Sequence, residues 1–131
     1  MERKLQIESK IENINKVEKI IDELSEELQL HSDLYGNLLI ATIEGVNNSI
    51  VHGNKFDANK KVNLTFSISD KQINVLIEDE GTGFDFDNVP DPTKPENIEN
   101  FHGRGIFLMK NLADDIEFLD EGRYIKLIFN Y

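Results

Sequence analysis

Three short groups of polar and glycine residues follow one another along this 131-residue chain, and each has a spacing that could support chemistry. The first group is Glu44, Asn48 and His52, which recur every four residues. In a helix that spacing puts the three side chains on one face. A carboxylate placed there could accept a proton from a hydroxyl or water, and a neutral amide oxygen is a suitable ligand for Mg²⁺.

The plain alternative for this group is a solvated polar face of a helix. Asparagine is unfavourable in the middle of a helix because its amide competes with the backbone hydrogen bonds, yet Asn47 and Asn48 stand side by side. That cost favours a functional role for Asn48 and for Glu44 one turn earlier. We expect His52 to stabilise the C-terminal end of the helix instead of taking part in chemistry.

The second group, Asp79-Glu80-Gly81-Thr82-Gly83, comes directly after an alternating apolar stretch. Asp79 could accept a hydrogen bond from the exocyclic amine of adenine. Gly81 and Gly83 would permit positive φ and a close approach of the backbone to a ligand. The alternative is an ordinary turn at the end of a strand, where Asp and Gly are common.

The third group, Gly103-Arg104-Gly105, is predicted to be a turn that opens a helix. It is not a Walker loop, because Ile106 stands where the lysine of that motif would be. Free backbone amides at a helix N-terminus could bind phosphate, and His102 and Arg104 would add positive charge. A glycine loop that merely precedes a helix is the alternative. Together, the three groups contain the parts of a nucleotide site.

The elements that must position these groups follow from the apolar periodicity. Spacings of three and four residues predict helices, and strict alternation predicts strands. We expect strands near residues 5–7, 62–68, 73–77, 116–119 and 124–131, and helices over residues 17–28, 34–50 and 105–112. Ser32 or Asp33 should cap the second helix, which should stop at Gly53. Three prolines and no apolar period in residues 84–102 predict a long loop that could act as a lid.

The order β-α-α-β-β-lid-α-β-β predicts an α+β fold. Hairpin-linked strands imply a mixed, mostly antiparallel sheet with three helices on one face, not a doubly wound parallel sheet. The length allows one core and not two, so we expect a single domain over residues 1–131.

The net charge of -11 argues against direct binding of nucleic acid, because phosphate backbones require a basic surface. An anionic nucleotide would need a divalent metal and local cations to enter such a protein. The chain has no cysteine, and it lacks the run of about 18 apolar residues that a membrane span needs. The expected location is therefore the cytoplasm.

The ordered motifs resemble a known family. Glu44-x-x-x-Asn48-x-x-x-His52-Gly53, Asp79-x-Gly81-x-Gly83 and Gly103-Arg104-Gly105-Ile106-Phe107-Leu108-Met109 look like the N, G1 and G2 boxes of the GHKL ATPases, which have the Bergerat fold. Within that superfamily the chain is most similar to the stand-alone anti-sigma factor serine/threonine kinases. Residues 91–97 resemble the proline-bearing lid of those kinases, and residues 111–116 resemble the segment after their G2 box.

This resemblance implies a two-layer α/β sandwich that binds ATP and Mg²⁺. By position it makes Glu44 the general base, Asn48 the Mg²⁺ ligand and Asp79 the adenine contact. The pocket would be shaped by four glycines: Gly81, Gly83, Gly103 and Gly105. Related sequences often carry a threonine in the last strand that supports the aspartate, and Lys126 aligns with it here.

The resemblance also implies a homodimer that phosphorylates a serine or threonine on a small anti-sigma factor antagonist and can sequester a sigma factor. Two other functions stay open at this point. One is a protein-binding module that senses ATP or ADP without transferring phosphate, and the other is the catalytic part of a sensor histidine kinase. Glu44 favours the kinase over the pure binder, because binding ATP does not require a base.

Overall fold

The computed structural model describes residues 1–81, 101–120 and 123–131, and only the backbone of residues 101–104. Gly83 and residues 84–100 of the expected lid therefore lie outside the described residues. The described chain forms five strands and three α-helices, with two short helical segments between them. In chain order these are β1 (Glu2–Glu8), η1 (Ile11–Asn13), α1 (Ile14–Leu28), α2 (Ser32–Asn48), the π-helix η2 (Ser49–Gly53), β2 (Lys61–Ile68), β3 (Gln72–Glu78), α3 (Phe101–Leu112), β4 (Asp115–Leu119) and β5 (Tyr124–Asn130).

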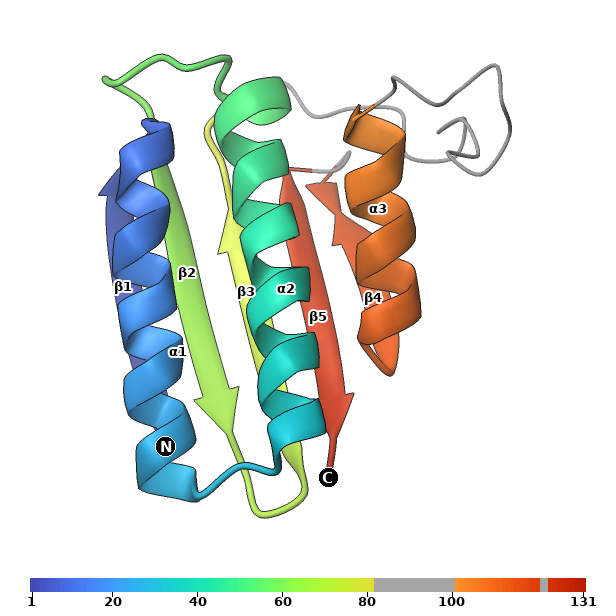
Figure 1. Cartoon of the computed structure of the whole chain (residues 1–131). Coiled ribbons are helices and arrows are strands. Elements are labelled where there is room, and N and C mark those ends of the chain that lie inside the picture. Colours follow the sequence, from blue (N-terminus) through green and yellow to red (C-terminus); the bar gives the residue numbers. More distant parts are fainter. Residues whose placement is uncertain (82–100, 121–122) are drawn as a thin grey trace.

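The strands form one sheet in the order β1-β2-β3-β5-β4. Each of these four neighbouring pairs is antiparallel. The three α-helices form a single layer in front of the sheet, so the described chain has two layers (Figure 1). The predicted α+β sandwich is confirmed, and the described pairings make its sheet antiparallel instead of mixed.

The hydrophobic core lies between the two layers. Alternate residues of β2, β3 and β5 point toward the helices and are buried, as their period of two requires. Helices α1 and α2 contribute the facing stripe, in which Val17, Ile21, Leu24 and Leu38 are fully buried. Burial of each such side chain stabilises the fold by about 1.5–3 kcal/mol.

Gly45 brings α2 unusually close to its neighbours. A Cβ atom on Gly45 would lie 2.5 Å from Cδ1 of Ile77 in β3 and 3.3 Å from Sδ of Met109 in α3. Because there is no such atom, α2 packs tightly into the angle between the sheet and α3. This packing fixes the height of the adjacent residues of α2 over the sheet.

The start of α2 differs from the prediction. Ser32 is already the first residue of the helix, and the capping residue is His31, whose Nδ1 accepts a hydrogen bond from the backbone N–H of Asp33 at 3.2 Å. Ser32 and Asp33 were expected as caps because of their side-chain type alone. An imidazole nitrogen can supply the same acceptor, which is why residue preference placed the cap one or two residues too late.

No helix within the described residues is both long and apolar enough to span a membrane.

Candidate functional site

The first and third sequence groups meet where α2 packs side by side with α3. A Cβ atom on Gly105 of α3 would lie 3.1 Å from Oε2 of Glu44 and 3.3 Å from Oδ1 of Asn48. The two side chains of α2 therefore face the backbone of α3 at a position that has no side chain of its own. The carboxylate of Glu44 and the amide oxygen of Asn48, which precede Gly105 by 61 and 57 residues in the sequence, are thus placed together beside the N-terminal half of α3.

The environment of Asn48 excludes the solvated-face interpretation for this residue. Only 3% of its surface is exposed, whereas Glu44 is half-buried. His52 lies in η2, and burial lowers the pKa of its imidazole. His52 stands in the last turn of η2, and the neutral imidazole that this shift favours interacts only weakly with a helix dipole.

Helix α3 begins earlier than predicted. It starts at Phe101, so Gly103-Arg104-Gly105 lies inside the helix and not in a turn before it. A glycine in a helix costs about 1 kcal/mol relative to alanine, but the missing Cβ of Gly105 permits the close contact with α2 that offsets this cost. Gly103 still belongs to the first turn, where backbone N–H groups lack partners within the helix. The side chains of His102 and Arg104 lie outside the described part.

Asp79 lies just past the end of β3 and is 6% exposed. Its Oδ1 accepts a hydrogen bond from the backbone N–H of Gly81 at 2.8 Å. Its own N–H donates to the carbonyl of Arg123 at 3.0 Å. A Cβ atom on Gly53 would lie 2.3 Å from Oδ2 of Asp79, so the carboxylate lies directly against the end of η2. Asp79 of the second sequence group therefore lies against Gly53, which directly follows His52 of the first group.

Opposing effects act on the carboxyl group of Asp79, and burial is the largest of them. Burial raises the pKa of this group above the ordinary value, and the Gly81 N–H and the positive charge of Arg123 offset part of that rise. A buried carboxylate of this kind is a strong hydrogen-bond acceptor because little water competes for it. It is suited to accept from a polar N–H group of a ligand.

Gly81 and Gly53 are in direct backbone contact. A Cβ atom on Gly81 would lie 2.0 Å from the carbonyl oxygen of Gly53. Neither glycine has φ in the left-handed region, so the positive φ that glycine would permit at Gly81 is not used. Glycine is required there because two stretches of backbone approach closely, not because of an unusual dihedral angle.

We therefore expect Gly81→Ala to destabilise the protein by about 1–3 kcal/mol, the usual cost of forcing extra atoms into a packed region. Ligand binding that depends on Asp79 should weaken with it. The matched control is Gly36→Ala in α2, where an added Cβ has no neighbour within 4 Å. Because alanine is the better helix former, that control should be neutral or slightly stabilising. Thermal unfolding measures both, and equal melting temperatures for Gly81→Ala and the wild type would contradict this packing.

The alignment of Lys126 with a threonine that supports the aspartate is wrong. Lys126 pairs with Leu76 of β3 and with Glu117 of β4. Its neighbours Ile125 and Leu127 are buried toward the helices, so Lys126 points to the opposite face of the sheet. Since side chains alternate along a strand, a shift of one residue in an alignment moves a side chain to the other face.

Two residues of the site region were not singled out from the sequence. Gly53 appeared only as the end of the first motif, although it contacts Asp79. Asn54 is 1% exposed and accepts a hydrogen bond from the backbone N–H of Glu80 at 2.8 Å. The signal for Asn54 was present, since a short amide residue after His52-Gly53 is typical of a side chain that bonds to backbone in a turn.

Comparisons with known proteins agree with this geometry. The model of the histidine kinase-like ATPase domain matches residues 7–129. Serine-protein kinase RsbW of Bacillus subtilis (strain 168) is 32% identical over 88 residues, which cover 61% of this chain and 54% of that protein. Anti-sigma F factor of Shouchella clausii (strain KSM-K16) is 33% identical over 82 residues, which cover 60% of this chain and 55% of that protein. The matches thus span about half the length of these curated relatives.

A solved structure also has this fold. The crystal structure of the RsbU and RsbW domains of Rv1364c from Mycobacterium tuberculosis superposes with a TM-score of 0.69 at 12% identity. The superposition covers 100% of this chain and 32% of that one. At that identity the likeness establishes the arrangement of strands and helices.

Proposed function

This chain belongs to the family of histidine kinase-like ATPase domains, and from that premise we propose that it is an ATP-dependent serine/threonine protein kinase of the anti-sigma factor type. One observation carries the proposal: Glu44 and Asn48 face the backbone of α3 together at Gly105. A carboxylate base beside a metal-binding oxygen, one turn from the N-terminus of α3, suits transfer of a phosphoryl group. The curated relatives named serine-protein kinase support the same activity.

The residues present fit ATP and Mg²⁺. Asp79 offers a buried acceptor for the amine of adenine. Gly53 and Gly81 pack closely beside Asp79, and neither has a side chain that would fill the space there. Asn48 offers the kind of oxygen that Mg²⁺ prefers. We assign Asp79, Gly81, Gly83, Gly103 and Gly105 to the nucleotide pocket, and Asn48 to the metal. When bound, ATP supplies the phosphoryl group and Mg²⁺ neutralises its charge.

Glu44 is the proposed general base. It would accept the proton of a serine or threonine hydroxyl while the hydroxyl oxygen bonds to the terminal phosphorus and the bond from that phosphorus to ADP breaks. The N–H groups in the first turn of α3, including that of Gly103, would donate to phosphate oxygens. His102 and Arg104 would add positive charge there. Asn48 would hold the geometry of the site by ligating the metal.

The proposed partners follow the same family. One relative is named anti-sigma F factor, which supports binding of a sigma factor by this chain. The phosphate acceptor would be a small anti-sigma factor antagonist, and the kinase would act as a homodimer in the cytoplasm. The acidic charge of the chain gives no support to direct binding of nucleic acid.

Transfer of labelled phosphate from ATP tests the function. Small antagonist-like proteins encoded near the gene are the first acceptors to try, with the purified chain as the only enzyme. Label on a serine or threonine of one of them is the expected result. If the chain binds ATP but labels none of these proteins, the nucleotide-sensing binding module becomes the better proposal.

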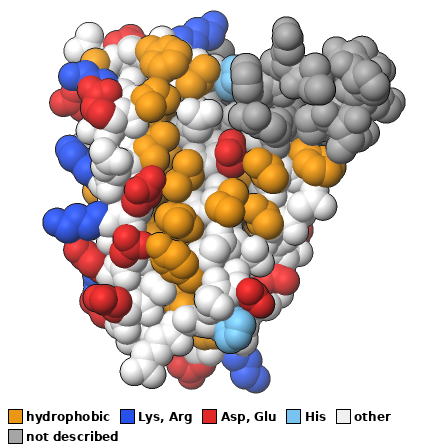
Figure 2. Space-filling view, in the orientation of Figure 1, with side chains coloured by type: hydrophobic (Ala, Val, Ile, Leu, Met, Phe, Trp, Pro, Cys, Tyr) orange, Lys and Arg blue, Asp and Glu red, His pale blue; other side chains and the backbone are white. Residues whose placement is uncertain are grey.

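Removal of Mg²⁺ should weaken ATP binding. On the face of the molecule that the helices cover, Lys and Arg side chains (blue) lie along the edges, while Asp and Glu side chains (red) also lie near the middle (Figure 2). With a net charge of -11 the protein repels free nucleotide phosphates, so chelation should lower the affinity at least about tenfold. Calorimetry with and without chelator measures this. In Asn48→Ala the difference between the two conditions should shrink, and equal affinities in the wild type would remove Asn48 from the metal role.

A further inference from the structure

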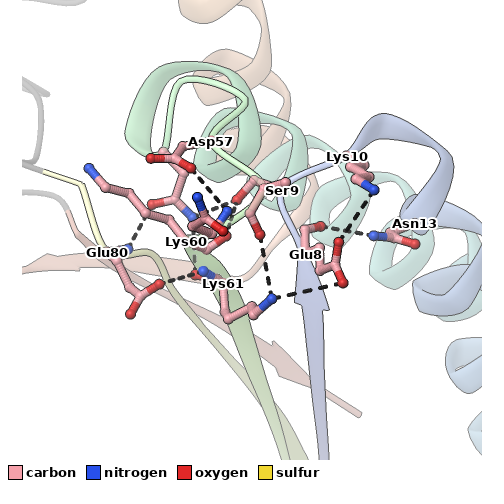
Figure 3. A network of polar contacts seen from close by, with 11 residues as sticks. Glu8, Ser9, Lys10, Asn13, Asp57, Lys60, Lys61 and Glu80 are labelled. Carbon is pink, nitrogen blue, oxygen red and sulfur yellow. Dashed lines mark hydrogen bonds and ion pairs between the residues drawn. The ribbon is translucent and has the colours of Figure 1, made fainter.

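A polar network built around the buried side chains of Ser9 and Asn54 lies where β1, β2 and β3 meet the candidate nucleotide site. Ser9, Lys60, Lys61 and Glu80 converge there from separate parts of the chain (Figure 3). At its centre Asn54 donates from Nδ2 to Oγ of Ser9 at 2.8 Å and to the carbonyl of Lys61 at 3.0 Å. Its Oδ1 accepts from the N–H of Glu80 at 2.8 Å. Both donor hydrogens and the acceptor of the amide are therefore used.

The orientation of the Asn54 amide is uniquely determined. The carbonyl of Lys61 can only accept a hydrogen bond, and the N–H of Glu80 can only donate one. A flipped amide would place oxygen against oxygen and nitrogen against nitrogen. Ser9 is also committed, because its hydroxyl donates to the carbonyl of Lys60 at 2.6 Å. Buried polar groups that are fully satisfied, as Ser9 and Asn54 are, make the surrounding backbone rigid.

Through Glu80 this rigidity reaches Asp79. The N–H that Asn54 accepts belongs to the peptide plane between Asp79 and Glu80. The side chain of Glu80 is held as well, since its Oε2 accepts from the backbone N–H of Lys61. The peptide plane before Asp79 is fixed by the carbonyl of Arg123. Both planes that flank Asp79 are thus held, and Asn54 holds the second.

We propose that Asn54 is a positioning residue for Asp79, and that it sets how strongly the site discriminates adenine from other bases. The inference rests on the proposed function, in which Asp79 accepts from the amine of adenine. Asn54 would not touch the nucleotide. It would act by keeping the carboxylate within hydrogen-bonding distance of that amine, which a small rotation of the peptide plane would lose.

The test compares the affinity for ATP with the affinity for the purine nucleoside triphosphate that lacks the 6-amino group. In the wild type ATP should bind more tightly. In Asn54→Ala that preference should fall about tenfold, the cost of weakening one hydrogen bond to the base. Ser9→Ala, which removes one partner of Asn54, should reduce it less and in the same direction. Asn74→Ala on β3 is the matched control, because its amide bonds to Gln72 and to no residue of the network.

A double variant separates positioning from general loss of structure. If Asn54 acts through Asp79, Asn54→Ala should leave the preference unchanged in an Asp79→Asn background. A further loss in that background would overturn the proposal, and so would a full preference for ATP in both Asn54→Ala and Ser9→Ala. A wild type with no preference for the 6-amino group would overturn the adenine role of Asp79 itself, and the proposal with it. Failure of the positioning role of Asn54 is therefore distinguishable from failure of the adenine role of Asp79.

Discussion

Replacing Glu44 by glutamine should abolish most phosphoryl transfer while leaving ATP binding intact. A positioned general base contributes about 100- to 10,000-fold to the rate, and glutamine keeps the shape of glutamate without its ability to accept a proton. The contact between Glu44 and Gly105 requires no charge, so the α2–α3 packing should survive. The rate of label transfer to the identified acceptor protein measures the loss, and calorimetry with ATP verifies binding.

Glu117→Gln is the matched control for that experiment. Glu117 is an exposed residue of β4 on the face of the sheet away from the helices, so the same change of charge there should leave the rate unaltered. Binding of a sigma factor, where it occurs, should also persist in Glu44→Gln. A Glu44→Gln enzyme as fast as the wild type would show that another group takes the proton.

Asp79→Asn should reduce ATP affinity by about 1–3 kcal/mol, the penalty for an unmade buried hydrogen bond. The N–H of Gly81 requires an acceptor, so the new amide should direct its oxygen toward Gly81. Its NH₂ group would then take the place of Oδ2 and face the hydrogens of the adenine amine. The variant should stay folded, because asparagine avoids the cost of a buried charge. Calorimetry with ATP and thermal unfolding together check both expectations.

The pH dependence of binding provides a second readout for Asp79. Burial raises the pKa of its carboxyl group, so the acceptor takes up a proton at a less acidic pH than an ordinary aspartate does. The preference for ATP over the analogue that lacks the 6-amino group should weaken as the pH falls through this raised pKa. Because the folded state binds the proton more tightly than the unfolded state, the contribution of Asp79 to stability decreases as the pH rises. Asp79→Asn should remove both pH dependences. Unchanged ATP affinity in the variant would show that adenine binds elsewhere.

The sequence was most informative where one local rule decides the structure. Strict alternation in residues 62–68 and 73–77 identified the β2–β3 hairpin, and its register confirms it. The four-residue spacing of Glu44 and Asn48 correctly placed both on one face of α2. These features depend on residues that are close in the sequence, so the spacing of apolar and polar residues predicts them directly.

The sequence was misleading where contacts between distant segments decide. Gly103 and Gly105 suggested a turn that ends where the helix begins, yet α3 already starts at Phe101, and the packing of Gly105 against α2 offsets the low helix propensity of glycine. Lys126 was assigned by alignment, and only the pairing with β3 shows which face it occupies. For Asn54 the local sequence indicates a turn residue, but its partners Ser9 and Glu80 lie 45 and 26 residues away. No local pattern encodes such tertiary partners.

The position of α3 has a consequence for how the site can be lost. Helix α3 packs on α2 and contacts β4, at one side of the helical layer (Figure 1). Glu44 and Asn48 belong to α2, while Gly105 belongs to α3, so separation of these two helices would dismantle the site and leave β1, β2, β3 and α1 folded. Such a partial opening requires less free energy than global unfolding. A ligand held by both helices opposes that opening in proportion to the logarithm of its concentration, so nucleotide supply would determine how firmly α3 stays docked.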